Sequence, residues 1–166
     1  MTLRLATESD IPLIADMARR IWLDYYPAVV SVEQVEYMLE RFYSATALSE
    51  QMHDGQAFYL PEATKLGAAG YLSVSKTVPG SYFMHKFYID NGLRGRGIGQ
   101  EALRLLGQVL PEMNELRLNV NRKNYQSINF YFKTGFVIES CMDIPIGNGY
   151  EMNDFRMVLH LKRSAL

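Results

Sequence analysis

Three glycines at alternate positions, Gly95, Gly97 and Gly99, separate a segment with the period of a strand from a segment with the period of a helix. The strand-like segment covers residues 81–90, and the apolar stripe of the helix runs through residues 98–109. Glycine lets the backbone adopt positive φ and approach a ligand closely. Because the first N–H groups of a helix and its dipole favour negative charge, this turn predicts an anion-binding loop.

The remaining segments alternate between the same two periods. We expect strands at residues 3–6, 56–60, 67–75, 81–90, 115–121 and 136–139, and in the segment that follows the turn at 147–149. We expect helices over residues 9–26, from the capping-box pattern at Ser31, and at residues 44–54, 98–109 and 124–134. No repeat, low-complexity tract or linker interrupts this order. The sequence therefore predicts one domain over residues 1–166, with a mixed α/β sheet and helices on both faces.

Composition narrows the function classes. Hydrophobic residues make up 48% and charged residues 21%, which is enough apolar material for a folded core. The net charge of -1 provides no bulk positive field, so we expect neither a nucleic-acid partner nor a membrane partner. No apolar run is long enough to span a bilayer, and the first residues contain no signal region. A lone cysteine, Cys141, suits a reducing compartment, so we expect a cytoplasmic protein.

Cys141 itself has two interpretations. A single cysteine can be a nucleophile, but no Cys-His signature surrounds this one. We therefore expect a small core residue. No metal site is expected either.

Two better-known phosphate loops are excluded. A dinucleotide fingerprint needs glycine where Gln100 stands, and an acidic residue at the end of the next strand, where Asn119 and Asn121 stand. A Walker loop needs Gly-Lys followed by Ser or Thr, which is absent. The pattern that fits is Arg-x-x-Gly-x-Gly, formed by Arg94, Gly97 and Gly99.

A second motif follows at residues 124–136: Asn124-x-x-Ser127-Ile128-x-Phe130-Tyr131-x-Lys133-x-Gly135-Phe136. Together the two motifs make the chain resemble the GCN5-related N-acetyltransferases. In the second signature of that family an Asn precedes a Tyr by seven residues, and Gly-Phe closes the helix. The resemblance covers nearly the whole chain in element order. It implies an α/β (α+β) fold with a single mixed, mostly antiparallel twisted sheet flanked by helices.

The resemblance also implies the cofactor, acetyl-coenzyme A, and the residues that hold it. The backbone of Phe87, Tyr88 and Ile89 is expected to line the pantetheine arm and to stabilise the oxyanion, while the side chains pack in the core. Asn124 and Lys133 match positions that contact the cofactor, although a plain surface charge fits Lys133 nearly as well. The pyrophosphate is expected on the loop residues Arg94, Gly95, Arg96, Gly97, Ile98 and Gly99, with the two arginine side chains as further partners.

Tyr131 is the expected general acid. The conjugate acid of the leaving thiolate has a pKa of ~8.5, and a phenol with a pKa of ~10 can donate a proton to it. The alternative is an aromatic core position beside Phe130 and Phe132. Three successive aromatic residues on a helix point in three directions, however, so they cannot all share one core face.

The acceptor requires a base and a binding surface. A primary amine has a pKa of ~10.4, so its deprotonation at neutral pH costs ~4–5 kcal/mol. His85 is a candidate base, directly or through water, although a buried structural histidine is the favoured interpretation. Asp154, Glu139 and Glu151 are candidates to attract a cationic acceptor, and solvation of strand ends is favoured for Glu139 and Glu151.

Three aromatic residues, Trp22, Tyr25 and Tyr26, fall where the family places its acceptor cleft. They are expected either to pack against an aliphatic amine or only to fill the core. The residues Tyr25-Tyr26 and Glu33-Gln34, ahead of Met38-Leu39, also resemble those of bacterial polyamine N-acetyltransferases.

These patterns predict an acetyl-coenzyme A-dependent N-acetyltransferase in which the amine attacks the thioester directly. The expected acceptor is a small amine or polyamine, while peptide N-termini and lysine side chains stay open. Two other classes stay open as well: a non-catalytic acyl-coenzyme A sensor or interaction module, and an α/β domain whose loop binds no nucleotide. Dimers are common in the family, so the resemblance leaves a homodimer open.

Overall fold

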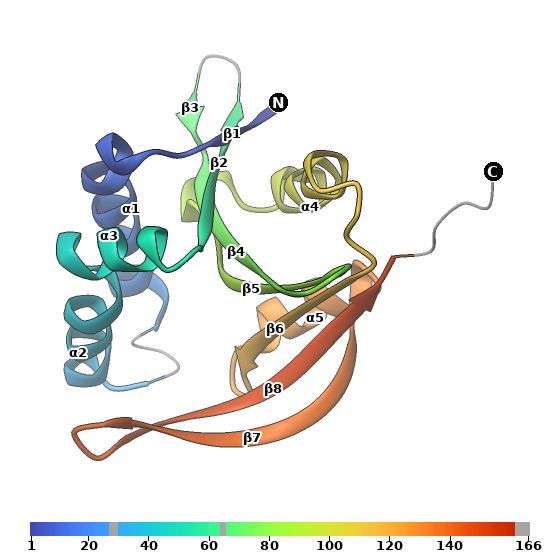
Figure 1. Ribbon diagram of the computed structural model, residues 1–166. Helices are drawn as coiled ribbons and strands as arrows, with labels where there is room; N and C mark the ends of the chain where they lie inside the picture. The colour runs from blue at the N-terminus through green and yellow to red at the C-terminus, as the bar shows by residue number, and fades with distance from the viewer. Residues whose placement is uncertain (27–29, 64–65, 162–166) are drawn as a thin grey trace. The chain divides into compact units, whose positions relative to one another are not determined.

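The computed structural model of the protein describes residues 1–26, 30–63 and 66–161, without the side chain of Tyr25 (Figure 1). The contacts of the chain divide it into two compact units. Unit 1 comprises Met1–Ser75 and Lys86–Leu110, and unit 2 comprises Lys76–His85 and Pro111–Leu166. The single domain expected from the sequence stays a prediction.

The strands join in an 8-stranded sheet with the order β1-β2-β4-β5-β6-β8-β7, and β3 pairs with β2. Strand β5 runs parallel to β6, whereas β2 runs antiparallel to β1, β3 and β4, and β8 runs antiparallel to β6 and β7. The predicted mixed, mostly antiparallel α/β fold class is confirmed. The strands are β1 Thr2–Leu5, β2 Ala57–Ala63, β3 Gly67–Ala68, β4 Gly70–Val78, β5 Ser81–Ile89, β6 Glu115–Asn121, β7 Val137–Gly147 and β8 Tyr150–His160. The helices are α1 Ile11–Tyr25, α2 Val32–Tyr43, α3 Ala45–His53, α4 Ile98–Val109 and α5 Tyr125–Lys133.

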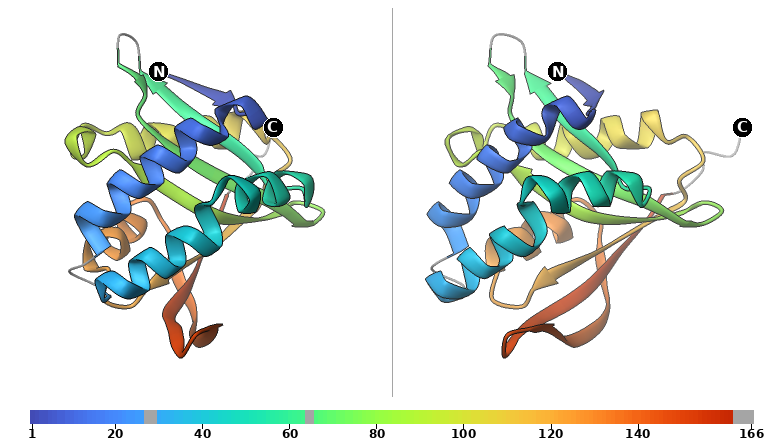
Figure 2. Two further views of the ribbon diagram at one scale, coloured as in Figure 1. Left: turned by 90° about the vertical axis from the view of Figure 1, so that its left-hand side faces the viewer. Right: turned by 60° about the vertical axis from the view of Figure 1, so that its left-hand side comes forward.

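Helices lie on both faces of the strands of unit 1. Figures 1 and 2 show α1, α2 and α3 together on one face, and α4 on the other, where it contacts β1. Local signals in the sequence set the helix ends. The hydroxyl of Ser31 accepts a hydrogen bond from the N–H of Gln34 (3.1 Å) and so caps α2, as expected. Gly55, with φ +92°, follows the end of α3.

Strand β6 carries the core of unit 2. Its apolar side chains Leu116, Leu118 and Val120 are buried on one face, and Met157 of β8 is buried opposite Leu118. Successive side chains of a strand point to opposite faces, so the polar residues between them share the other face. Unit 2 therefore has one apolar face and one polar face.

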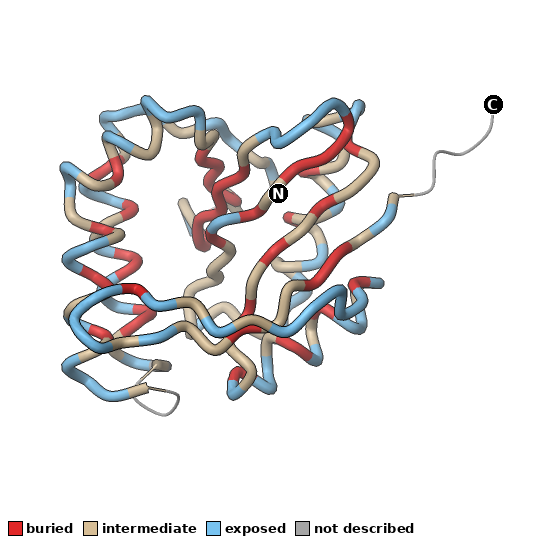
Figure 3. Tube along the Cα trace, turned by 60° about the horizontal axis from the view of Figure 1, so that its bottom comes forward, coloured by how far each residue is buried: buried red, intermediate tan, exposed pale blue. Residues whose placement is uncertain are grey.

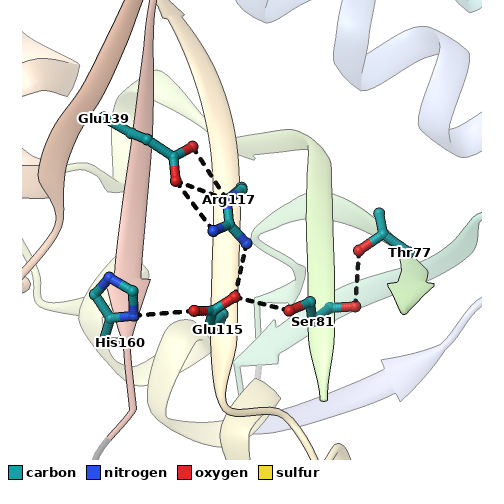
Figure 4. Close-up of polar contacts among 6 residues, drawn as sticks. All are labelled: Thr77, Ser81, Glu115, Arg117, Glu139 and His160. Carbon is teal, nitrogen blue, oxygen red and sulfur yellow. Dashed lines mark hydrogen bonds and ion pairs between the residues drawn. The ribbon is translucent and has the colours of Figure 1, made fainter. Parts of the chain in front are cut away.

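The polar face of unit 2 carries an ion-pair network near the start of β6 (Figure 4). Arg117 donates to both oxygens of Glu139 (3.0–3.1 Å) and to Glu115 (2.8 Å). The hydrogen bond from Arg117 lowers the pKa of the Glu115 carboxyl. The groups of this network come from five strands, β4 to β8, and the network fixes the start of β5 against β6 and β8. Its members are Thr77, Ser81, Glu115, Arg117, Glu139 and His160.

Strand β7 is longer than the sequence predicts and lies at the edge of the sheet (Figure 1). Figure 3 shows how buried and exposed residues alternate along the chain. The expected strand ended at residue 139, but pairing with β8 continues to Gly147. Most of β7 is exposed, so its sequence lacks the apolar alternation that marks a half-buried strand. Cys141 lies on this edge, and the expectation of a core cysteine is wrong: Cys141 is exposed, and its Sγ accepts a hydrogen bond from Arg122 (2.9 Å).

Among the residues that the structure describes, unit 1 buries one cation. The side chain of Lys86 on β5 is 7% exposed, and its ammonium lies 5.0 Å from the ring centre of Tyr43 and 5.7 Å from that of Phe58. No acidic side chain within the described residues forms an ion pair with it. Burial lowers the pKa of Lys86 from 10.5 to about 8. The two rings offset only part of the lost hydration.

Replacement of Lys86 by Met should therefore stabilise the protein by about 1–3 kcal/mol at pH 7, since each unit of pKa shift corresponds to ~1.4 kcal/mol. The folded protein releases this proton more readily than the unfolded chain, so the stability of the wild type rises as the pH rises from 8 toward 10. The advantage of Lys86→Met should shrink over the same range. Urea unfolding at pH 7 and pH 10 measures both effects.

The matched control is Lys76→Met, which removes an exposed lysine from β4. Its free energy of unfolding should stay within about 0.5 kcal/mol of the wild type. Equal stability of Lys86→Met and the wild type at pH 7 would contradict the cost assigned to the buried ammonium.

Candidate functional site

The glycine-rich loop has the backbone conformation that its sequence predicts. Gly95 and Gly97 have φ +77° and φ +76°, and Gly97 is the residue that precedes the first turn of α4. A Cβ atom on either glycine would meet no atom within 4 Å, so the space beside the backbone is open. Gly97 has no side chain to cap α4, and the first N–H groups of the helix are left for another acceptor. The loop therefore fits an anion, and Arg96 beside it is exposed.

Hydrogen bonds hold both ends of the segment before this loop. Asp90 accepts from the N–H of Gly92 (3.1 Å) and from the guanidinium of Arg20 on α1 (2.7 Å). The Nε of Arg94 donates to the carbonyl of Ile89, the last residue of β5 (3.3 Å). One donor of Arg94 is thus directed to the backbone.

The end of β5 is placed by an unusually close approach of β4. A Cβ atom on Gly70 would lie 2.1 Å from the carbonyl oxygen of Tyr88 and 2.9 Å from the Cα of Ile89, so only glycine fits. The N–H of Asp90 also donates to the carbonyl of Ala69 (2.9 Å). Gly70 was not predicted as a site residue, although a glycine inside a strand pattern is a known sign of close backbone approach.

Aromatic side chains surround Tyr88 in unit 1. Its ring centre lies 5.7 Å from that of Trp22, 6.4 Å from Tyr26, 6.5 Å from Tyr43 and 5.2 Å from Tyr71. Trp22 is buried and stacks on Tyr26 at 4.3 Å, which favours the core-filling interpretation for Trp22. As the resemblance implies, the side chain of Tyr88 packs in this core. The side chain of Tyr25 lies outside the described residues.

The second motif forms helix α5 in unit 2. Asn124 caps this helix, since its side-chain oxygen accepts from the N–H of Ser127 (3.1 Å), and it is buried. The three successive aromatic residues diverge as expected: Phe130 is half-buried, Tyr131 is buried and Phe132 is exposed. The Tyr131 ring packs at 5.3 Å from Phe136, while Lys133 at the end of the helix is exposed.

His85 lies on the polar face of unit 2. The expectation that it is a buried histidine is wrong, because this position of β5 is exposed. Its ring lies 4.9 Å from that of Phe83, and the guanidinium of Arg156 on β8 lies 5.6 Å from the centre of the Phe83 ring. The Nε of Arg156 donates to the side-chain oxygen of Asn119 (3.2 Å). Three strands therefore contribute to one polar surface.

Asp154 lies on the same face of β8, two residues before Arg156. It is 1% exposed, and neither carboxylate oxygen has a hydrogen-bond partner among the described residues. Burial raises the pKa of Asp154 from 3.8 to about 6, although the positive charge of Arg122 acts in the opposite direction. A buried carboxylate without partners is costly, and such groups are often found at functional sites.

The other two carboxylates considered for the acceptor differ from Asp154. Glu139 is paired with Arg117, and Glu151 is exposed. The structure therefore favours a surface role for both. A hollow of about 790 Å³ lies between the start of α1 and helix α3, and none of the residues that line it was predicted as a site residue.

Comparison with known proteins decides the family. The sequence pattern of the acetyltransferase (GNAT) family matches residues 15–136. The chain belongs to the GNAT family of acetyltransferases. The predicted enzyme class, N-acetyltransferase, is thereby confirmed, and so is acetyl-coenzyme A as the acetyl donor. In the described part of the chain, no helix has both the length and the apolar composition needed to cross a membrane.

Relatives of this GNAT protein match it over most of its length. An uncharacterised N-acetyltransferase of Mycobacterium bovis is 25% identical over 155 residues, covering 92% of this chain and 99% of that protein. A spermidine N(1)-acetyltransferase of Thermoplasma acidophilum is 22% identical over 143 residues, covering 82% and 88%. The crystal structure of PaiA N-acetyltransferase from Thermoplasma acidophilum, in complex with coenzyme A, has a TM-score of 0.77 at 21% identity and covers 97% and 100%. That structural likeness establishes the fold.

The residues of the loop fit the pyrophosphate of acetyl-coenzyme A. The two glycines with positive φ leave the backbone accessible, and the uncapped first turn of α4 supplies N–H donors. Strand β5 pairs with β6 over Ser81–Met84 and continues to Ile89.

The buried carboxylate generates a stability prediction. Asp154→Asn should raise the free energy of unfolding at pH 8 by about 1–3 kcal/mol, because the amide has nearly the same shape and no charge. The folded protein retains the Asp154 proton up to about pH 6, whereas the unfolded chain loses it near 3.8. The wild type therefore loses stability as the pH rises from about 4 to 6, and the difference should vanish below pH 4.

Urea unfolding of both proteins across pH 3.5–8 checks this prediction. Glu151→Gln is the control, since it removes an exposed charge from the same strand and should change stability little. A destabilised Asp154→Asn protein at pH 8 would show that the carboxylate is held by favourable contacts.

Proposed function

We propose that this protein transfers an acetyl group from acetyl-coenzyme A to a primary amine of a small molecule, with polyamines as the foremost class. The observation that carries the proposal is the open, glycine-lined loop 94–99 at the uncapped start of α4, in a chain of the GNAT family. The spermidine N(1)-acetyltransferase among the relatives supports a polyamine acceptor. Acetyl-coenzyme A supplies the acetyl group as an activated thioester.

The chain provides two sets of backbone donors for this cofactor. The N–H groups of loop 94–99 bind the pyrophosphate, and the side chains of Arg94 and Arg96 add positive charge. The N–H groups of Phe87, Tyr88 and Ile89 bind the pantetheine arm, and one of them polarises the acetyl carbonyl. The contact of Gly70 with the backbone of Tyr88 supports this role, because it holds these donors rigidly. Asn124 and Lys133 are further cofactor contacts in this proposal.

Tyr131 acts as the general acid in the proposed mechanism. Its hydroxyl gives a proton to the departing thiolate, whose conjugate acid has a pKa of ~8.5. The matched motif and the packing of the Tyr131 ring against Phe136, which restricts its rotation, support the role. His85 is the candidate that removes a proton from the acceptor amine, directly or through water, and its exposure supports access to substrate.

The proposal also includes the setting in which the enzyme works. The lone cysteine and the near-zero net charge support a cytoplasmic protein with a small-molecule partner. Peptide N-termini, lysine side chains and a purely sensing role are the competing outcomes that a substrate panel separates.

Tyr131→Phe should lower kcat about 100-fold, because general acid catalysis contributes on that scale. The dissociation constant for acetyl-coenzyme A should change less than about twofold, since the ring stays in place. A free-thiol assay over amines, polyamines and peptides measures the rate, and calorimetry measures binding. Tyr125→Phe is the matched control, because it removes a hydroxyl from a 71% exposed tyrosine on the same helix.

An unchanged kcat in Tyr131→Phe would remove Tyr131 from the mechanism. Calorimetry of the wild type with coenzyme A tests the cofactor separately. Binding without transfer to any amine would indicate a sensor, and the absence of binding would refute the whole proposal.

A further inference from the structure

Asp154 is the one buried charged side chain of the polar face of unit 2, as far as the structure describes it. Both of its oxygens are buried and have no hydrogen-bond partner among the described residues, whereas Glu115 and Glu139 of this face are bound by Arg117. In native proteins a buried carboxylate almost always has a hydrogen-bond donor. Such a group therefore either lowers the stability of the fold without compensation or accepts a hydrogen bond from a ligand.

The two arginines near Asp154 donate their hydrogen bonds to other acceptors. The guanidinium of Arg122 donates to Asp143 and to the Sγ of Cys141. The guanidinium of Arg156 lies over the ring of Phe83 and donates to Asn119. Neither arginine donates a hydrogen bond to Asp154 in the described structure, so neither guanidinium satisfies its carboxylate oxygens.

A metal ion does not fit this position. The described residues contain no group of three or more His, Cys, Asp or Glu side chains that could hold one. The residues paired with Asp154 across the sheet are Asn121 on β6 and Met142 on β7, which add no second carboxylate. A single carboxylate instead suits an organic ammonium, which carries one positive charge and up to three N–H donors.

Asp154 also lies on the face of the sheet that carries His85, the candidate base for the acceptor amine. Register places Asp154 opposite Asn121 and Arg156 opposite Asn119, and Arg156 contacts Phe83, the neighbour of the exposed His85 ring. His85, the candidate that removes a proton from the reacting amine, and Asp154 therefore lie on the same face of the strands of unit 2. A reacting amine has to be neutral, so a fixed carboxylate is suited to a second, charged amine of the same molecule.

We infer that Asp154 is a specificity-determining residue whose carboxylate binds a distant ammonium group of the acceptor, so that di- and polyamines are preferred over monoamines. This inference rests on the proposed N-acetyltransferase function and adds the residue that selects the acceptor. Removal of the charge weakens binding of acceptors with two or more amines. It leaves acceptors with one amine unaffected, because their only nitrogen is the reacting one.

Asp154→Asn tests the inference with spermidine and butylamine as acceptors. The KM for spermidine should rise about 10- to 100-fold, the usual effect of losing a charged hydrogen bond. The kcat for spermidine, the KM for butylamine and the affinity for acetyl-coenzyme A should each stay within about twofold. Glu151→Gln, which removes an exposed charge from the same strand, should behave as the wild type.

Two results would overturn the inference. One is an unchanged KM for spermidine in Asp154→Asn. The other is an equal fall in kcat for spermidine and butylamine with no change in KM, which would make Asp154 a proton acceptor instead of a binding group. Thermal unfolding of each variant identifies any loss that comes from misfolding.

Direct binding separates this inference from the proposed function. Calorimetry with spermidine in the presence of coenzyme A requires no acetyl transfer. If the wild type acetylates no amine but binds spermidine, and Asp154→Asn does not bind it, the proposed function fails and the inferred contact holds. If both proteins bind spermidine equally, or neither binds it, the inferred contact is wrong whatever the outcome of the transfer assay.

Discussion

The close approach of β4 to β5 at Gly70 is the constraint on which the arrangement of unit 1 depends. The backbone of Tyr88 can lie against β4 only because Gly70 has no side chain, and the ring of Tyr88 is enclosed by four other aromatic residues. Gly70 thus fixes the backbone of Tyr88, and the aromatic rings fix its side chain. The chain then continues through Asp90 and Arg94, each held by hydrogen bonds, into the glycine-rich loop. The loop starts from a rigid support, which an anion site made of backbone donors requires.

Each unit also contains a buried charge that weakens the fold. Lys86 in unit 1 and Asp154 in unit 2 lie in places where apolar or neutral side chains would be more stable. Their environments differ. Lys86 faces two aromatic rings, which are partial substitutes for water, whereas the carboxylate of Asp154 has no such substitute among the described residues. Because its oxygens lack donors, Asp154 is the buried charge that we propose as a ligand contact, whereas Lys86 is not.

Periodicity predicted the elements that have one apolar face. Helix α4 at Ile98–Val109 and strand β6 at Glu115–Asn121 have the predicted bounds, because each buries a regular stripe of apolar side chains. Periodicity did not predict the full length of β7, because this edge strand is mostly exposed and has no regular apolar face. Exposure of His85 and Cys141 depends on which strands lie beside them, and a linear pattern does not contain that information. That Asp154 has no hydrogen-bond partner among the described residues is likewise a property of three-dimensional packing. The sequence therefore indicated the carboxylate but not the absence of donors around it.

Trp22 gives the aromatic cluster of unit 1 a spectroscopic consequence. It is the single tryptophan of the chain, so the indole emission of the whole protein comes from one position. That indole is 4% exposed, stacks on Tyr26 and lies beside Tyr88, whose backbone belongs to the proposed cofactor contact. An indole enclosed by tyrosine rings also receives excitation energy from them. The protein therefore carries its own optical reporter next to β5, and a change at the end of that strand alters the emission without any added label.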